Sequence, residues 1–231
     1  MTKSELQEQL VRLFLRLNGY LTSGLIIHSS QKGNNKTELD IVAVRFPNHK
    51  QIDRQVECSK YMDYPTDSID IIIGEVKGQK APANFNAALH NDKDAIEKLV
   101  NWLGMFSNEQ ICQVQCDVFK MLQPKQINSS EKFDTLKYTF DSGNYTIRAI
   151  LFCPDRPKPK NNQIKYVYGQ LMLDFIWECL RPEILRSTCS TVYPTNMWGI
   201  DFTHLVEYFK DENKTTVGTV TDLYTHFKIK N

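Results

Sequence analysis

The stretch Asp70-Ile-Ile-Ile-Gly-Glu-Val-Lys-Gly78 decides the fold that this sequence predicts. Its apolar run between Asp70 and Gly74 is β-branched and too short for a helix, so it indicates a buried β-strand. Side chains alternate along a strand, and we therefore expect Glu75 and Lys77 on one face and Val76 on the other. A carboxylate and an ammonium group thus lie side by side at the end of a buried strand.

A second stretch, Glu38-Leu-Asp-Ile-Val-Ala-Val-Arg45, indicates a neighbouring strand that begins at Asp40. Alternation places Asp40 on the same face as Val42 and Val44. Burial of two carboxylates and a lysine at the ends of neighbouring strands costs free energy unless something compensates their charges. Mg²⁺ or Mn²⁺ does so directly, because hard divalent cations prefer carboxylate oxygen. The alternative is a strand end whose charged groups simply point into water.

Residues 4–18 have the apolar spacing of an amphipathic helix, with Ser4 as the expected N-cap and Asn18-Gly19 as the end. The stripe expected to face the sheet consists of Leu6, Leu10, Leu13 and Leu17. Glu8 lies at the end of a second apolar stripe, whereas Glu5 lines up with Arg12 on an expected solvated face. Helical geometry therefore selects Glu8 as the acid that reaches the candidate site. The alternative is that both acids only complement the helix dipole.

At these residues the chain resembles the PD-(D/E)xK nucleases, which have the restriction-endonuclease-like fold. The pattern of that family is a helix with a Glu, a strand hairpin with an Asp, a strand that ends in (D/E)-x-K, and another helix. Asp40 matches the Asp, with Leu39 where proline often stands, and Glu75 and Lys77 match the (D/E)-x-K. The resemblance covers roughly residues 4–106, and this region is also similar to a group of uncharacterised prokaryotic nuclease-like proteins.

The resemblance implies an α/β fold with a central mixed β-sheet flanked by helices. We expect one domain over residues 1–231, with a core over 4–152 and a C-terminal helical extension over 166–210. One departure from the family pattern is the 34 residues between Asp40 and Glu75, which exceed the length of a tight hairpin. This departure leaves the register of the two motif strands open.

The resemblance also implies metal-dependent hydrolysis of phosphodiester bonds, with DNA as the first candidate substrate. One or two Mg²⁺ or Mn²⁺ ions would be held by Asp40, Glu75 and the Val76 carbonyl, with Glu8 completing the shell. Lys77 would orient or help to deprotonate a metal-bound water. Whether the protein forms a homodimer is left undecided by the sequence. The alternatives are an inactive nuclease-fold protein that binds nucleic acid or protein, and a structural module in which Glu75 and Lys77 only pair with each other.

The bulk properties narrow these expectations. The chain of 231 residues has a net charge of +1, which argues against a protein that coats nucleic acid through overall charge. The polar N-terminus predicts no signal peptide and a cytoplasmic protein, in which the six cysteines stay reduced. The segment 154–165 is the densest in basic residues, namely Arg156, Lys158, Lys160 and Lys165. It is a candidate phosphate contact or an exposed proline-rich loop.

Further elements follow from apolar spacing and turn residues. We expect a strand over 20–29, a helix that begins after Asn91 or Asp92, and a hairpin around residues 141–144. Two more helices are predicted over 167–180 and 203–210. The segment 109–122 is ambiguous, and the C-terminus from Lys214 onward carries no pattern that predicts an element.

Overall fold

The structure is a computed structural model that describes residues 1–28, 35–50, 56–124, 132–160, 163–181 and 198–229. Its helices and strands follow one another in this order: α1 (Lys3–Leu17), β1 (Leu21–His28), β2 (Asn35–Arg45), the short 3-10 helix η1 (Lys60–Met62), β3 (Ile69–Val76), α2 (Ala87–Asn91), α3 (Lys93–Leu103), α4 (Asn108–Met121), β4 (Asp134–Phe140), β5 (Gly143–Cys153), β6 (Val167–Tyr168), α5 (Gly169–Leu180), α6 (Thr203–Lys210) and α7 (Val220–His226).

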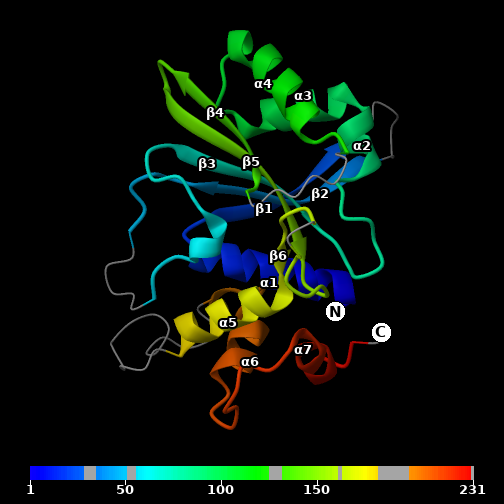
Figure 1. Cartoon of the computed structure of the whole chain (residues 1–231), viewed down its shortest axis with the longest axis vertical. Helices are drawn as coiled ribbons and strands as arrows, with labels where there is room; N and C mark the ends of the chain where they lie inside the picture. Colours follow the sequence, from blue (N-terminus) through cyan, green and yellow to red (C-terminus); the bar gives the residue numbers. More distant parts are fainter. Residues whose placement is uncertain (29–34, 51–55, 125–131, 161–162, 182–197, 230–231) are drawn as a thin grey trace.

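A mixed β-sheet of six strands crosses the middle of the molecule (Figure 1). Its strand order is β1-β2-β3-β5-β4, with β6 paired to the end of β5. β3 and β5 run parallel, as do β5 and β6, and the other neighbours are antiparallel. The prediction of an α/β chain with a central mixed sheet is therefore confirmed. β3, the strand of the decisive stretch, lies in the interior of the sheet.

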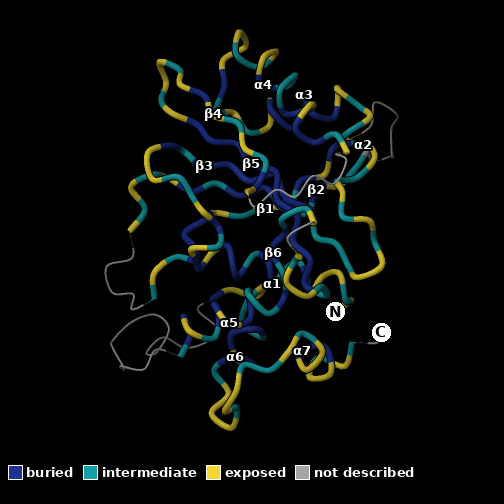
Figure 2. The backbone as a smooth tube through the Cα atoms, in the orientation of Figure 1, coloured by how far each residue is buried: buried dark blue, intermediate teal, exposed yellow. Residues whose placement is uncertain are grey.

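Helices cover both faces of this sheet and enclose two hydrophobic cores (Figures 1 and 2). The helices α1, α5, α6 and α7 pack on one face, and α3 and α4 pack on the other. Alternate side chains of β3 point to opposite faces, so Ile72 joins the first core while Ile71 and Ile73 join the second. The region expected as a helical extension thus contributes α5 and α6 to the core beneath the sheet.

Helix α1 confirms the predicted stripe, since Leu6, Leu10, Leu13 and Leu17 are all buried. The prediction of Ser4 as N-cap was wrong. Thr2 caps the helix instead, because its hydroxyl accepts from the Glu5 N–H and the Glu5 carboxylate accepts from the Thr2 N–H at 2.6 Å. Glu5 is thereby engaged at the helix end. A capping box takes Glu or Gln three residues after the cap. Gln7 stands there for Ser4, but its buried side chain donates to the Tyr224 hydroxyl instead.

Asp70 lies inside β3, where a strand-border position was expected, and it is fully buried. Its carboxylate is held by Arg148 of β5, whose Nε lies 2.9 Å from Oδ1 and whose Nη2 lies 2.5 Å from Oδ2. The Tyr20 hydroxyl donates to the same carboxylate, and Arg148 also donates to the Met62 carbonyl. A buried charge pair is stable only when its remaining donors and acceptors are satisfied in this way.

The remaining elements agree with the sequence in part. Asp92 caps α3 as expected, the predicted helix over 203–210 is α6, and the ambiguous 109–122 is the helix α4. The helix α7 was not predicted. Within the described ranges, none of the helices combines the length and the apolar character that a membrane crossing requires.

Candidate functional site

The carboxyl end of β3 carries the two residues of the (D/E)-x-K pattern. Glu75 is the penultimate residue of the strand and is fully buried, and Lys77 follows directly after the strand. The Lys77 Nζ lies 2.9 Å from Glu75 Oε2 and donates to Asn86 Oδ1 at 2.7 Å. The prediction that Glu75 and Lys77 share a face is therefore confirmed.

Asp40 of β2 joins these residues through the backbone of β3. The Val76 N–H donates to Asp40 Oδ2 at 2.7 Å, in a register that pairs Ile41 with Gly74. A separation of Asp40 from Glu75 would have favoured a purely structural Glu–Lys pair, and the structure instead brings the two acids together. The role expected for the Val76 carbonyl stays a prediction, since the group that Val76 contributes here is its N–H.

Gly74 permits the close approach of the strands at this point. A Cβ atom at Gly74 would lie 2.9 Å from the Ile41 Cβ and 2.9 Å from Phe152 Cε2, closer than packed carbon atoms come. The glycine that precedes Glu75 in the sequence therefore has a packing role.

The expected alternation along β2 is interrupted at Asp40. The pairing of β1 with β2 shifts between Ser23 and Leu25, so that Asp40 and Ile41 both lie opposite Gly24. As a result, Leu39 and Val42 pack in the same core although they are three residues apart. A β-bulge thus interrupts the alternation at this position, and that Asp40 shares the face of Val42 and Val44 stays a prediction.

Glu8 of α1 approaches the same site from below the sheet. Burial raises the pKa of its carboxyl, and the nearby charges of Asp40 and Glu38 raise it further. The Glu8 carboxylate accepts from the Ser4 hydroxyl at 3.2 Å and lies 3.8 Å from Arg12 Nη2. Glu8, Asp40, Glu75 and Lys77 therefore belong to one neighbourhood, although Glu8 is engaged with Arg12.

Arg12 is a member of the site that the sequence did not predict. Its Nη2 lies 3.5 Å from the Asp40 carbonyl and only 2.8 Å from where a Cβ of Gly24 would stand. The expectation of a solvated face for Arg12 was wrong, because the missing side chain of Gly24 leaves room for the guanidinium over the bulge. The signal that could have found it is its position four residues after Glu8.

Asn86 was also missed, and it holds Lys77 from the loop that follows β3. Its Oδ1 accepts from Lys77 Nζ, and its Nδ2 donates to the Glu38 carbonyl at 3.3 Å. It thus links the lysine to β2 next to Asp40. No spacing or residue pattern in the sequence points to this residue.

Burial dominates the electrostatics of Glu75. It raises the pKa of the Glu75 carboxyl to about 7, and the Asp40 charge adds to this rise, while Lys77 and the Asn86 backbone N–H oppose it. Among the described residues, the buried Glu75 Oε1 has no hydrogen-bond partner. A buried carboxylate oxygen without a partner is costly, so a cation or a proton at this atom would stabilise the site.

The donor set fits a hard divalent cation. Glu75 Oε1 lacks a partner, the Asp40 carboxylate lies beside it, and such oxygens are the ligands that Mg²⁺ and Mn²⁺ prefer. In the described part of the chain, however, no three His, Cys, Asp or Glu side chains are grouped closely enough to hold a metal ion. Asp40 and Glu75 are thus the residues that could hold the ion, and Glu8 would have to leave Arg12 to join them.

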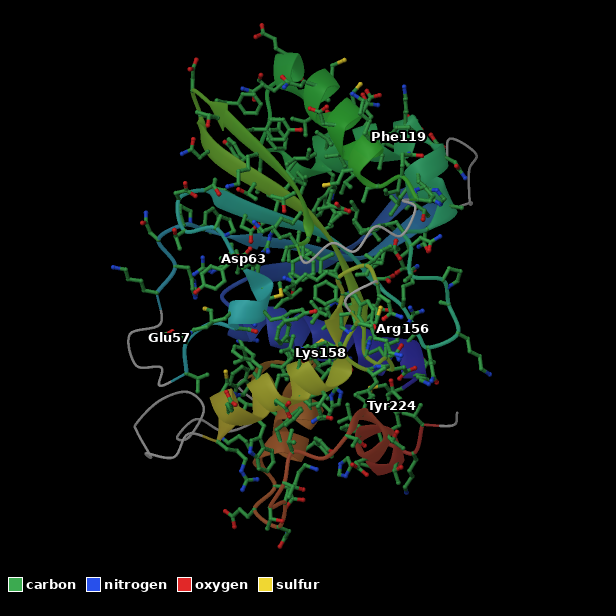
Figure 3. All side chains as sticks on the ribbon, viewed as in Figure 1. Glu57, Asp63, Phe119, Arg156, Lys158 and Tyr224 are labelled. Atoms are coloured by element: carbon green, nitrogen blue, oxygen red, sulfur yellow. The ribbon has the colours of Figure 1, made fainter. Side chains whose placement is uncertain are left out.

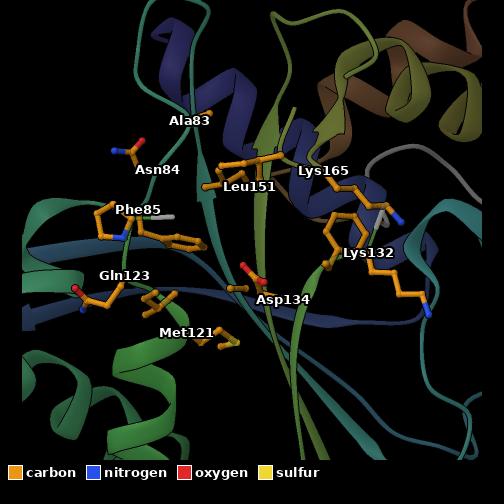
Figure 4. A pocket seen from close by; sticks show the side chains of 14 residues that line it. Ala83, Asn84, Phe85, Met121, Gln123, Lys132, Asp134, Leu151 and Lys165 are labelled. Carbon is orange, nitrogen blue, oxygen red and sulfur yellow. The ribbon is translucent and has the colours of Figure 1, made fainter. Parts of the chain in front are cut away.

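A separate cavity of about 340 Å³ lies between the end of α4, β5 and residues 83–85 (Figure 4). Phe85 and Met121 line it on one side, and Lys132 and Lys165 lie at the other. None of the four candidate residues lines this cavity. The basic segment 154–165 is therefore divided, with Lys165 at the cavity and Arg156 and Lys158 at a cleft that adjoins Gly78.

The likeness to the PD-(D/E)xK nucleases rests on the order of the motif residues in the sequence, and their convergence is a property of this structure. Comparison of the chain with family models, with curated proteins and with solved structures finds no match.

Proposed function

We propose that this protein is a metal-dependent phosphodiesterase of the restriction-endonuclease-like fold that hydrolyses nucleic acid, with DNA as the first candidate. The order of the site elements supports the fold. A helix carries Glu8, the β1–β2 hairpin carries Asp40, β3 ends in Glu75-Val76 with Lys77 directly after it, and helices follow. That is the order of the family pattern, here on adjacent elements of one sheet.

The single observation that carries the proposal is the state of Glu75. It is fully buried at the end of an interior strand, its Oε1 has no partner among the described residues, and its neighbour is a second carboxylate. A residue that served only to pair with Lys77 would have no need of Asp40, whose negative charge disfavours the ionised Glu75. Such paired acids with a perturbed pKa are characteristic of functional sites.

Each residue of the site has a chemical task in this proposal. Asp40 and Glu75 would hold Mg²⁺ or Mn²⁺, which when bound polarises the phosphate and lowers the pKa of a water ligand. Lys77 is positioned by Glu75 Oε2 and Asn86 Oδ1, so its ammonium would orient the attacking water and stabilise the negative charge that develops on the phosphate. Arg12 keeps the bulge in place through the Asp40 carbonyl.

A second candidate is a non-catalytic protein that keeps this fold to bind nucleic acid or protein. The observation that favours it is the engagement of Glu8 by Arg12, together with the direct ion pair of Glu75 and Lys77. In this case the acids would be neutralised within the protein, and no metal would be required.

A cleavage panel distinguishes the two candidates. The substrates are linear, circular, nicked, branched and single-stranded DNA, together with RNA, each with Mg²⁺, with Mn²⁺ and with a chelator. We expect metal-dependent cleavage by the wild type and its loss in Asp40→Asn. The matched control is Glu97→Gln, which removes an exposed acid of α3. Cleavage that survives in Asp40→Asn contradicts the proposed site.

Thermal stability provides a readout that does not depend on the choice of substrate. Metal should raise the melting temperature of the wild type and of Glu97→Gln, and it should leave Asp40→Asn unchanged. An equal response of all three proteins, or no response to either metal, favours the non-catalytic candidate.

A further inference from the structure

A large cleft begins where the candidate site ends. It has a volume of about 1130 Å³, and Gly78, which directly follows Lys77, is one of its lining residues. Its walls come from five parts of the chain: residues 3–7 of α1, residues 78–81 after β3, residues 154–158 after β5, residues 168–170 at the start of α5, and residues 219–224 around α7. Figure 3 shows Arg156, Lys158 and Tyr224 on the same side of the molecule.

The cleft carries an excess of positive charge. Lys80 and Lys158 line it, are exposed, and have no ion pair or side-chain hydrogen bond within the described residues. An adjoining pocket of about 400 Å³ shares Arg156 and Lys158 with the cleft and adds the exposed Lys160. The whole chain has a net charge of only +1, so this concentration of unpaired cations is local.

The negative charge of Asp155, which lines this cleft, is compensated by neighbouring groups of the protein. Asp155 has a side chain only 8% exposed, and Lys3 Nζ lies 2.9 Å from its Oδ2. The Tyr224 hydroxyl donates to the same carboxylate and accepts from Gln7 Nε2 at 2.7 Å. These contacts fasten α7 to α1 and leave Asp155 with little negative field to repel an anion in the cleft.

Arg156 fixes the loop that connects the cleft to the candidate site. Its Nη2 donates to the Gly78 carbonyl at 3.4 Å and to the Ala81 carbonyl. The backbone between Lys77 and the cleft is therefore tied to the end of β5. Arg156 thus has a structural role, and Lys80, Lys158 and Lys160 remain as the cations that can meet a ligand.

We propose that this cleft binds the phosphodiester backbone of a nucleic-acid strand and leads it to Glu75 and Lys77; the inference rests on the function proposed above. Three lysines without a side-chain partner among the described residues are spread over the cleft and its neighbouring pocket. They suit a repeated anion, which a polymer with one charge per nucleotide supplies. Gly78 lines the cleft and directly follows Lys77, so the cleft begins one residue along the chain from the candidate site.

The test measures binding without cleavage. The full-length wild type, kept in chelator, is titrated against fluorescent single-stranded DNA, RNA of the same sequence and duplex DNA, and anisotropy is recorded between about 50 and 200 mM salt. The test variant combines Lys80→Gln, Lys158→Gln and Lys160→Gln. The control variant combines Lys93→Gln, Lys120→Gln and Lys137→Gln, exposed lysines of α3, α4 and β4.

We expect the test variant to bind its strand about tenfold more weakly at the low salt concentration and to lose about 2 from the slope of log Kd against log salt on a single strand, as the removal of three phosphate contacts predicts. The control should bind like the wild type. The strand type with the largest effect identifies the form of nucleic acid that the cleft takes.

Equal Kd values for the test and control variants overturn the proposal, as does the absence of binding to all three strands. Equal competition by polyglutamate also overturns it, because this polyanion has no phosphate. Normal binding without any metal-dependent cleavage instead refutes the phosphodiesterase function and leaves the cleft as a nucleic-acid site. Cleavage that persists at the wild-type rate in the test variant refutes the cleft and leaves the function.

Discussion

Replacing Glu75 by Gln should stabilise the protein at alkaline pH while it removes metal binding. The carboxyl is fully buried, and its pKa rises from 4.5 to about 7 because burial disfavours the charged form. A rise of this size makes the ionised group less stable in the fold by about 3 kcal/mol. The folded protein therefore holds the proton more tightly than the unfolded chain does between these two pKa values.

The sign of the pH dependence follows from this difference in bound protons. The contribution of Glu75 to the free energy of unfolding is fully present below pH 4.5, decreases as the pH rises, and is lost above about pH 7. Glutamine cannot ionise, so Glu75→Gln escapes the decrease. We expect it to be more stable than the wild type by about 1–3 kcal/mol at about pH 8 and equal to it at about pH 4.

Urea denaturation at these two pH values, in chelator and then with Mg²⁺ or Mn²⁺, measures both effects. A divalent ion at about 100 times its Kd should stabilise the wild type by about 2.7 kcal/mol at the higher pH and leave Glu75→Gln unchanged. The reasoning is refuted if the two proteins have the same free energy of unfolding at both pH values, or if the variant is less stable by the same amount at both.

Further predictions concern four single positions. Asp40→Asn keeps an oxygen that can accept the Val76 N–H, so its free energy of unfolding should change by less than about 1 kcal/mol. Its metal-dependent cleavage should nevertheless fall by orders of magnitude. Lys77→Ala should lose cleavage to a similar extent. Arg148→Met leaves Asp70 buried without its cation and should destabilise by about 3–5 kcal/mol in urea. Gly74→Ala places a methyl group 2.9 Å from two packed side chains and should cost about 1–3 kcal/mol.

Matched variants decide each of these outcomes. Glu97→Gln should cleave like the wild type, and a similar loss of cleavage in it would show that the effect of Asp40→Asn is unspecific. Asp70→Asn combined with Arg148→Met should lose less stability than the single changes added together; simple additivity would contradict the buried pair. Gly78→Ala has an open position, with its nearest contact at 3.9 Å, so an equal loss there would contradict the packing role of Gly74.

The parts of the fold that the sequence could predict are those with a strong local pattern. The leucine stripe of α1 and the isoleucines of β3 each repeat with the period of one element, and both are buried as expected. Helix α4 begins in a polar sequence and buries only Val114, Val118 and Met121, which is too sparse a stripe to decide between helix and loop. Helix α7 is seven residues long and presents little periodicity of its own.

In the candidate site, too, some contacts could be predicted from a local sequence pattern and others could not. Glu75 and Lys77 are two residues apart at the end of one strand, so their proximity followed from alternation alone. The contact of Asp40 with Val76 depends on the pairing of β2 with β3 across a long insertion, which the sequence left open. Three other features depend on tertiary packing, and no local pattern encodes them. They are the bulge at Asp40, the position of Arg12 over Gly24, and the hydrogen bond between Lys77 and Asn86.

The strand β3 carries a buried acid near each end, and the two acids are treated differently by their surroundings. Both carboxylate oxygens of Asp70 accept hydrogen bonds from Arg148 or Tyr20. Glu75 Oε1, in contrast, has no hydrogen-bond partner among the described residues. The Asp70 end of the strand is thus held by a satisfied hydrogen-bond network, and the Glu75 end is not. Substitution of Glu75 is therefore the simplest route to a more stable protein, at the same residue that our proposal makes a metal ligand.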